Sequence, residues 1–204
     1  MFPSQQSALP KLGSIYLKLQ DIYLNYMQQR YKFDLWQSFG AYPTGVSIGH
    51  FTHPRGIPHV VRTIGYDVQK DKTLEYGYRL NPKLDDLIHK WTPRVSRAIA
   101  LTKSVVPDLI EIGVPRQNIV IVPCGVNYSR FNSIEFNKNS IRQIYGIPND
   151  VFTFITVGRN HPKKGFAILV KALAKMKLNP EIEVELIFDD KELDLSTRQA
   201  DIGI

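Results

Sequence analysis

Short β-branched segments alternate with segments of helical period along this chain, and the alternation limits the folds that are open to it. Strands are predicted at Phe33–Phe39, Pro58–Thr63, Ala98–Thr102 and Ile119–Val122. The segments between them carry apolar residues every three or four positions, which is typical of one face of a helix. Because right-handed crossovers join strands that are separated by helices, the sequence predicts an α/β fold. Its parallel sheet should be covered by helices on both faces.

Proline and asparagine mark the starts of several predicted helices. Helices are predicted at Pro10–Arg30 and Tyr42–His53. Asn81 is predicted to cap a further helix that begins at Pro82, since Asn satisfies free N–H groups and Pro suits the first turn. The apolar residues that mark the buried face of this helix are Leu84, Leu87, Ile88 and Trp91.

A change in composition divides the chain. Between Val126 and Pro148, Asn, Ser and charged residues gather and the apolar periodicity fades. We predict a domain boundary there, with one domain at residues 1–137 and the start of a second domain at residues 138–204. The elements predicted in the second part are a strand at Val151–Val157, a helix at Gly165–Leu178 and a strand at Glu183–Phe188.

A basic loop follows the predicted strand Val151–Val157 and leads into the helix. It contains Gly158, Arg159, Lys163 and Lys164. At such a position, free N–H groups and the positive end of the helix dipole add to the side-chain charge and favour an anion. The loop therefore predicts a site for a phosphate or diphosphate. The alternative is that the cations are solvated and only cap a surface helix.

Charge and cysteine content restrict the partners and the compartment. The net charge of +7 and the pI near 9.4 favour a partner that carries phosphates. The basic residues are scattered, with no run longer than Lys163-Lys164, so we expect no dedicated polyanion-binding tail and no nucleic acid partner. A nucleic-acid-binding protein, suggested only by the pI, is the alternative. The single cysteine, Cys124, excludes an internal disulfide and favours a reducing compartment, so we expect a cytoplasmic chain. Cys124 itself is predicted to be a small buried thiol at a strand end.

No apolar run in the sequence has the length of a membrane span. The amphipathic helix around Leu12–Tyr26 has few lysines. This favours packing onto the sheet over binding to a membrane surface, and it leaves a peripheral membrane contact as the alternative.

Five segments in a fixed order resemble one known family. They are Phe33-Asp-Leu-Trp-Gln-Ser-Phe-Gly40, Arg62-Thr-Ile-Gly-Tyr-Asp-Val-Gln69, Tyr76-Gly-Tyr-Arg-Leu80, Ile121-Val-Pro-Cys-Gly-Val-Asn127 and Val157-Gly-Arg-Asn-His-Pro-Lys-Lys-Gly165. Together they resemble glycosyltransferase family 4, and the resemblance covers nearly the whole chain.

The resemblance implies a GT-B fold. Residues 1–137 would form part of an acceptor-side Rossmann-like domain, and residues 138–204 would form the first βαβ of a donor-binding Rossmann-like domain. The implied activity is that of a retaining glycosyltransferase, which moves a sugar from a nucleotide-sugar donor to an unidentified glycan or lipid acceptor. Arg159 and Lys164 would contact the donor diphosphate, and Gly158 would let the backbone approach it. No cofactor and no metal are implied, because the nucleotide-sugar is a substrate and the two cations replace a metal.

The resemblance also predicts a chain that is truncated at both ends. The glycine-rich loop of the family would precede Met1, and its Glu-x7-Glu pair, which holds the donor, would follow Ile204. Ile64 stands where many members have a histidine that contacts the sugar. The alternative function is therefore a non-catalytic remnant or interaction module of the same fold, with at most weak nucleotide binding.

Three residues are candidates for the acceptor side, and they are Asp67, Tyr76 and Arg79. Asp67 follows a strand end, where open α/β sheets bind ligands, and the alternative is that it satisfies its own turn. Tyr76 and Arg79 would line an acceptor pocket or cover a helix edge.

Three histidines are spaced closely enough to be considered as metal ligands. They are His50, His53 and His59. No thiolate or carboxylate completes the set, so we interpret them as loop histidines and expect no metal.

Overall fold

The computed structural model describes residues 5–129, 137–154, 156–159 and 161–176. The chain divides into two compact units, Met1–Thr153 and Phe154–Ile204, which are described separately here. The domain boundary predicted after residue 137 stays a prediction, because residues 130–136 beside it lie outside the described residues.

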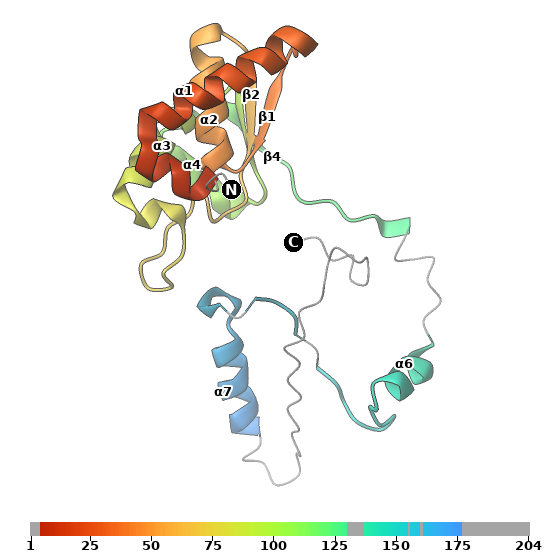
Figure 1. The fold of residues 1–204 in the computed structure, drawn as a ribbon. Coiled ribbons are helices and arrows are strands. Elements are labelled where there is room, and N and C mark those ends of the chain that lie inside the picture. The colour runs from red at the N-terminus through yellow and green to blue at the C-terminus, as the bar shows by residue number, and fades with distance from the viewer. Residues whose placement is uncertain (1–4, 130–136, 155, 160, 177–204) are drawn as a thin grey trace. The chain divides into compact units, whose positions relative to one another are not determined.

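The first unit contains a four-stranded parallel sheet in the order β1-β2-β3-β4 (Figure 1). Its strands are β1 (Trp36–Phe39), β2 (His59–Arg62), β3 (Arg97–Ala100) and β4 (Ile119–Ile121). Every adjacent pair is parallel and each strand pairs with the next one in the chain. The predicted α/β fold with a parallel sheet is thus confirmed, with each strand shorter than the segment predicted for it.

Each crossover between strands contains a helix. These helices are α2 (Val46–Thr52), α3 (Pro82–Trp91) and α4 (Val106–Glu111). The start of α3 agrees with the sequence, since the Asn81 side chain accepts a hydrogen bond of 3.0 Å from the N–H of Lys83 and Pro82 occupies the first turn. The helix predicted at Tyr42–His53 is split, with regular α-helix only in α2.

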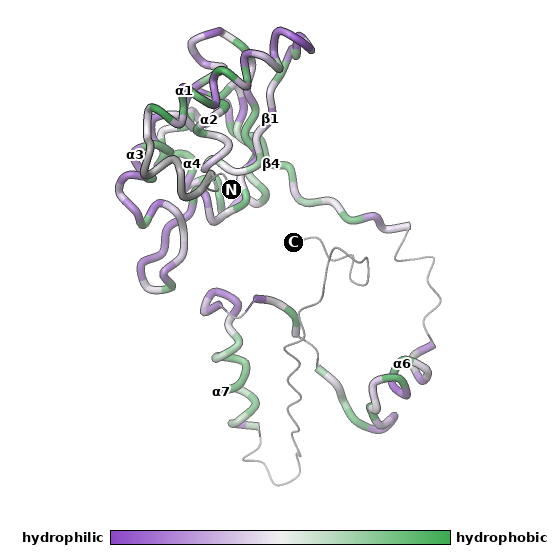
Figure 2. Tube along the Cα trace, in the orientation of Figure 1, coloured by the Kyte–Doolittle hydropathy of each residue, from purple (hydrophilic) through white to green (hydrophobic). Residues whose placement is uncertain are grey.

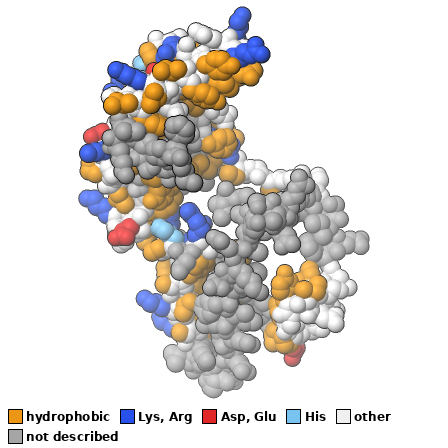
Figure 3. Space-filling model, viewed as in Figure 1, with side chains coloured by type: hydrophobic (Ala, Val, Ile, Leu, Met, Phe, Trp, Pro, Cys, Tyr) orange, Lys and Arg blue, Asp and Glu red, His pale blue; other side chains and the backbone are white. Residues whose placement is uncertain are grey.

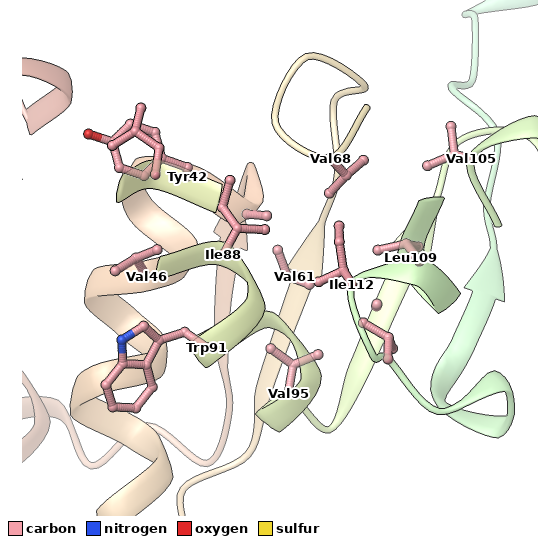
Figure 4. Close-up of a cluster of buried hydrophobic side chains, with 14 of the residues drawn as sticks. Tyr42, Val46, Val61, Val68, Ile88, Trp91, Val95, Val105, Leu109 and Ile112 are labelled. Carbon is pink, nitrogen blue, oxygen red and sulfur yellow. The ribbon is translucent and has the colours of Figure 1, made fainter. Parts of the chain in front are cut away.

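The hydrophobic core lies between the sheet and these helices. Figure 4 shows Val61 of β2 in one cluster with Val46 of α2, Ile88 of α3 and Leu109 of α4. All four side chains are at most 1% exposed. At about 25 cal/mol per Å² of apolar surface, burial of such side chains is the main favourable contribution to folding. The core therefore fixes the helices on one face of the sheet.

The opposite face of the sheet is exposed in residues 5–129. Paired positions put Phe39, Arg62, Ile99 and Val120 in one row on that face. Phe39 is 65% exposed and Val120 is 42% exposed. The prediction of a sheet covered on both faces is therefore wrong for this part of the chain. The reason is topological, because right-handed crossovers that all run from one strand to the next in the same direction place their helices on the same face.

The long helix α1 (Gln5–Tyr31) precedes the sheet and begins earlier than the predicted Pro10–Arg30. It bends at Gly13, whose φ is 48°. Tyr16, Leu17 and Leu24 are buried, and the helix packs mainly against α2 and the turn Ala41–Gly45 rather than directly on the sheet.

Polar contacts fix α1 in place. The Trp36 indole donates a 2.7 Å hydrogen bond to Oε1 of Gln28.

No helix among the described residues is both long and apolar enough to cross a bilayer.

Within the described residues, the helices α6 (Lys138–Ile144) and α7 (Phe166–Met176) follow the sheet along the chain, and most of α7 is hydrophobic (Figure 2). The described residues of the predicted strand Val151–Val157 do not form a strand, which contradicts the prediction. A parallel strand depends on hydrogen bonds to a neighbouring strand rather than on its own sequence. The strand predicted beside it, Glu183–Phe188, lies outside the described residues, as does the end of the helix predicted at Gly165–Leu178.

A buried serine–histidine pair joins β1 to β2. Nε2 of His59 lies 2.9 Å from Oγ of Ser38, and the two residues are 3% and 2% exposed. Nδ1 of His59 is buried without a hydrogen-bond partner. Burial lowers the pKa of His59 to about 4, so the imidazole is neutral in the folded protein at neutral pH.

We expect acid to destabilise the fold through His59. The unfolded chain takes up a proton near pH 6.5, whereas the folded protein does so only near pH 4. Stability from the neutral imidazole is thus present above pH 6.5 and lost as the pH falls toward 4. The loss between pH 7 and pH 5 is about 2 kcal/mol. Urea unfolding at both pH values gives the free energy of unfolding of the wild type and of His59→Gln. The wild type should lose about 2 kcal/mol more than the variant between pH 7 and pH 5.

His53→Gln is the matched control, because His53 is an exposed histidine in the turn after α2. This variant should keep the pH dependence of the wild type. If the free energy of unfolding depends on pH equally in the wild type and in His59→Gln, His59 is not the cause of the loss of stability in acid.

Candidate functional site

The carboxyl ends of β1 and β2 form the sheet edge at which the acceptor-side candidates were predicted. In open α/β sheets, ligands bind outside these ends. β1 is followed by Gly40, whose φ of 83° and close approach to the carbonyl of Tyr42 suit glycine. β2 is followed by the turn Thr63–Val68, which carries Asp67.

Asp67 ties the two strand ends together. It is fully buried, and its carboxylate accepts hydrogen bonds of 2.5 Å from the N–H of Ala41 and 2.9 Å from the N–H of Ile64. Burial raises the pKa of the Asp67 carboxyl, and the backbone hydrogen bonds act in the opposite direction. The carboxylate therefore satisfies its own turn, which was the alternative to acceptor contact, and it also pins the loop after β1.

Arg79 is engaged inside the protein as well. Its side chain is 0% exposed and donates hydrogen bonds to the Val68 carbonyl at 2.8 Å, to Asp85 at 2.7 Å and to Glu111 at 2.9 Å. The hydrogen bond from Arg79 is the main reason that the pKa of the Glu111 carboxyl is lowered. Arg79 thus joins the segment after β2 to α3 and α4. In this structure it is a scaffold residue rather than the lining of a pocket.

Tyr76 ends a row of aromatic rings at this edge. The rings of Tyr42 and Tyr78, of Tyr78 and Tyr66, and of Tyr66 and Tyr76 meet edge to face at 5.0, 4.7 and 4.8 Å between centroids. Burial and the neighbouring tyrosines raise the pKa of Tyr42 to about 12. Tyr42 is buried, while the other three are partly exposed.

Sequence reasoning missed Tyr66 as a member of this group. The available signal was the recurrence of tyrosine on both sides of the Asp71–Glu75 loop. An antiparallel bridge between Asp71 and Tyr76 closes this loop and brings Tyr76 back to Tyr66.

Cys124 lies at the same edge and is exposed, so its prediction as a buried thiol is wrong. The reason is that β4 ends at Ile121, which leaves Cys124 in the loop beyond the strand. Nη2 of Arg62 lies 3.4 Å from Sγ of Cys124. Cζ of the same guanidinium lies over the Phe39 ring, 5.7 Å from its centroid.

The basic loop belongs to the second unit. An added Cβ on Gly158 would lie 3.3 Å from Cζ of Phe166 and 3.7 Å from Cγ of Lys164. The structure thus brings together Gly158 and Lys164, two of the three residues predicted to bind the donor diphosphate. Arg159 is exposed beside them.

A short 3₁₀ turn, Pro162–Lys164, leads from this loop into α7. Nδ1 of His161 accepts a hydrogen bond of 3.2 Å from the N–H of Lys163, which caps the turn. Gly165 has a φ of 73°, a left-handed conformation that lets the chain enter α7 at once. Residues 157–176 contain no acidic residue, so the charged side chains of this segment are all basic and add to the positive end of the helix dipole.

The three histidines considered as metal ligands have separate surroundings. Nδ1 of His50 pairs with Oδ1 of Asp21 at 3.0 Å, His59 contacts Ser38, and His53 lies in a turn after α2. In the part of the chain that the structure describes, no three His, Cys, Asp or Glu residues are grouped so as to hold a metal ion.

Comparison with known proteins identifies the first unit. Residues 6–130, more than half of the chain, match the family model described as Glycosyltransferase Family 4. The chain belongs to glycosyltransferase family 4. The match spans all four strands and the edge that carries Asp67 and Tyr76. The resemblance is therefore confirmed for residues 6–130, whereas the segment Val157–Gly165 lies outside the match.

The other comparisons add little. A solved structure of UDP-N-acetylglucosamine 2-epimerase from Rickettsia bellii is similar with 14% identity and a TM-score of 0.41. The similarity covers 54% of this chain and 27% of that chain, so this family 4 chain spans about a quarter of the solved protein's length. No curated protein matches the sequence.

Removal of the Asp67 carboxylate should destabilise the family 4 domain. Asp67→Ala leaves the buried N–H of Ala41 and the partly buried N–H of Ile64 without their acceptor, and we expect the free energy of unfolding to fall by about 2 kcal/mol. Chemical denaturation followed by circular dichroism measures the change.

Asp86→Ala is the matched control, because Asp86 is an exposed aspartate on α3. We expect it to stay within about 0.5 kcal/mol of the wild type. Equal stability of Asp67→Ala and Asp86→Ala would show that Asp67 does not hold the two strand ends.

Proposed function

We propose that this chain is a retaining glycosyltransferase that moves a sugar from a nucleotide-sugar donor to a glycan or lipid acceptor. The observation that carries the proposal is the acid-free basic loop at the start of α7, with the Lys164 side chain beside Gly158, in a member of glycosyltransferase family 4. The loop is the part that holds the leaving group.

The chemistry of sugar transfer explains why cations are needed there. When the bond between the anomeric carbon and the donor diphosphate breaks, negative charge builds up on the diphosphate. Fixed positive groups stabilise this charge in the transition state more than in the ground state, which lowers the barrier. Arg159 can make two parallel hydrogen bonds to phosphate oxygens, while Lys164 acts as a point charge.

Gly158 serves the same interaction by leaving space. A Cβ on residue 158 would lie 3.3 Å from the Phe166 ring, which is tighter than an ordinary contact, and 3.7 Å from the Lys164 side chain. A side chain there would press on Phe166 and fill the space over the backbone next to Lys164. The loop thus combines a close backbone approach with two exposed cations.

In this proposal the two cations take the place of a divalent metal, and the nucleotide-sugar is a substrate. The acceptor would approach the carboxyl edge of the first unit, where Tyr76 is the partly exposed member of the predicted set. Asp67 and Arg79 contribute by holding this edge in shape, through the hydrogen bonds described above. We place the reaction in the cytoplasm.

Nucleotide binding should depend on the loop cations. We expect Arg159→Ala combined with Lys164→Ala to weaken binding of a nucleoside diphosphate by roughly tenfold or more, since two charge-assisted contacts are lost. Calorimetric titration of the full chain with UDP, GDP and ADP measures the effect.

The matched control removes two lysines from α7, the helix that follows the loop. Lys171→Ala combined with Lys175→Ala makes the same change in net charge, and both lysines are exposed on α7. This control should bind like the wild type. If the wild type and both double variants bind the nucleoside diphosphates equally, Arg159 and Lys164 do not form a diphosphate site.

Transfer itself is tested by incubating the full chain with a panel of nucleotide-sugars and measuring released nucleoside diphosphate. We expect release to persist in EDTA and to fall by at least about tenfold in the Arg159, Lys164 double variant. NMR of the product should show the anomeric configuration of the donor. Nucleotide binding without release from any donor would instead favour the non-catalytic interaction module.

A further inference from the structure

The outward face of α1 carries a stripe of large apolar side chains. Its members follow a helical spacing and are 58 to 69% exposed, and they are Ile15, Leu19, Ile22, Tyr23 and Tyr26. Figure 3 shows hydrophobic side chains on the part of the surface where α1 lies. We call these five residues the α1 stripe.

The α1 stripe is not needed to hold α1 on the protein. The opposite face of the helix, with Tyr16, Leu17 and Leu24, is already buried in the packing described above. A surface helix usually has one apolar face and one polar face. A contiguous apolar surface on the second face is typical of an interaction site.

The charges that border the α1 stripe are positive. Lys18 and Arg30 are exposed on α1. The one acidic residue between positions 13 and 31 is Asp21, and its carboxylate is turned toward His50 at 3.0 Å and Arg55 at 3.9 Å. The surface that meets the stripe should therefore be anionic. A second copy of this chain would bring like charges together at the rim, which disfavours self-association.

We propose that the α1 stripe binds the surface of a lipid bilayer that contains anionic lipids. The aliphatic side chains would enter the boundary between headgroups and acyl chains. The rings of Tyr23 and Tyr26 suit this boundary because one end of a tyrosine is apolar and the other is polar. Lys18 and Arg30 would contact headgroup phosphates.

The width of the stripe favours a membrane over a partner helix. Ile15, Leu19, Ile22 and Tyr26 form the narrow seam that a second helix would use, and Tyr23 broadens it on one side. A broad apolar face with a cationic border is typical of helices that lie in a membrane interface. The inference does not depend on sugar transfer or on the basic loop.

Vesicle binding of the full chain tests the proposal. Sedimentation with vesicles of phosphatidylcholine alone is compared with vesicles that also contain phosphatidylserine. We expect binding to the anionic vesicles, weakened by added salt, and much weaker binding to the neutral ones.

Two variants separate the stripe from general hydrophobicity. Leu19→Gln combined with Ile22→Gln should reduce binding to anionic vesicles by roughly tenfold or more, because two inserted side chains are lost. Ile110→Gln is the control, since Ile110 is 49% exposed on α4 and outside the stripe. It should bind like the wild type. Circular dichroism verifies that both proteins are folded.

A probe in the stripe makes the test independent of that variant's folding. In a Cys124→Ser background, an environment-sensitive fluorophore on Ile22→Cys should brighten and shift to the blue with anionic vesicles, whereas one on Ile110→Cys should not. The proposal is overturned by a wild type that does not bind anionic vesicles or by an unchanged Ile22→Cys probe. It is also overturned by light scattering that shows a dimer lost in the Leu19, Ile22 double variant without vesicle binding.

Discussion

All three crossovers between β1 and β4 run in the same direction across the sheet, and the arrangement of the first unit depends on this constraint. Right-handed connections then place α2, α3 and α4 on one face, where Val61, Ile88 and Leu109 form the core. The opposite face, with Phe39 and Val120, stays exposed in residues 5–129. One topological rule thus decides both where the core lies and which surface is left for other contacts.

The same topology brings the carboxyl ends of β1 and β2 side by side, and buried polar groups hold them there. Asp67 binds the backbone of both strand ends, and Arg79 fastens the following segment to α3 and α4. Such groups are costly to bury unless their hydrogen bonds are satisfied, so each fixes the geometry around it. The edge is therefore shaped by buried residues, while Tyr76 remains partly exposed.

Local signals predicted the start of α3 well. The Asn81–Pro82 cap depends on residues close in sequence, and it has the expected form. Gly158 and Lys164 are also close in sequence and in the structure, but the described residues before them do not form the predicted strand. The burial of Asp67 and Arg79, the exposure of Cys124 and the aromatic row from Tyr42 to Tyr76 depend on residues far apart in sequence. No local pattern encodes where a distant carboxylate such as Glu111 meets a guanidinium.

The sequence by itself determined the family, the order of strands and helices from α1 to β4, and the position of the basic loop, because motif spacing and apolar periodicity are properties of the chain alone. Only the tertiary structure decided which face of the sheet is covered and which candidate residues are buried. It also decided that α1 is apolar on two opposite faces, with Leu24 in the core and Ile22 exposed. A periodic pattern records that a residue is apolar. Whether another element covers that residue is settled by the path of the chain between the strands.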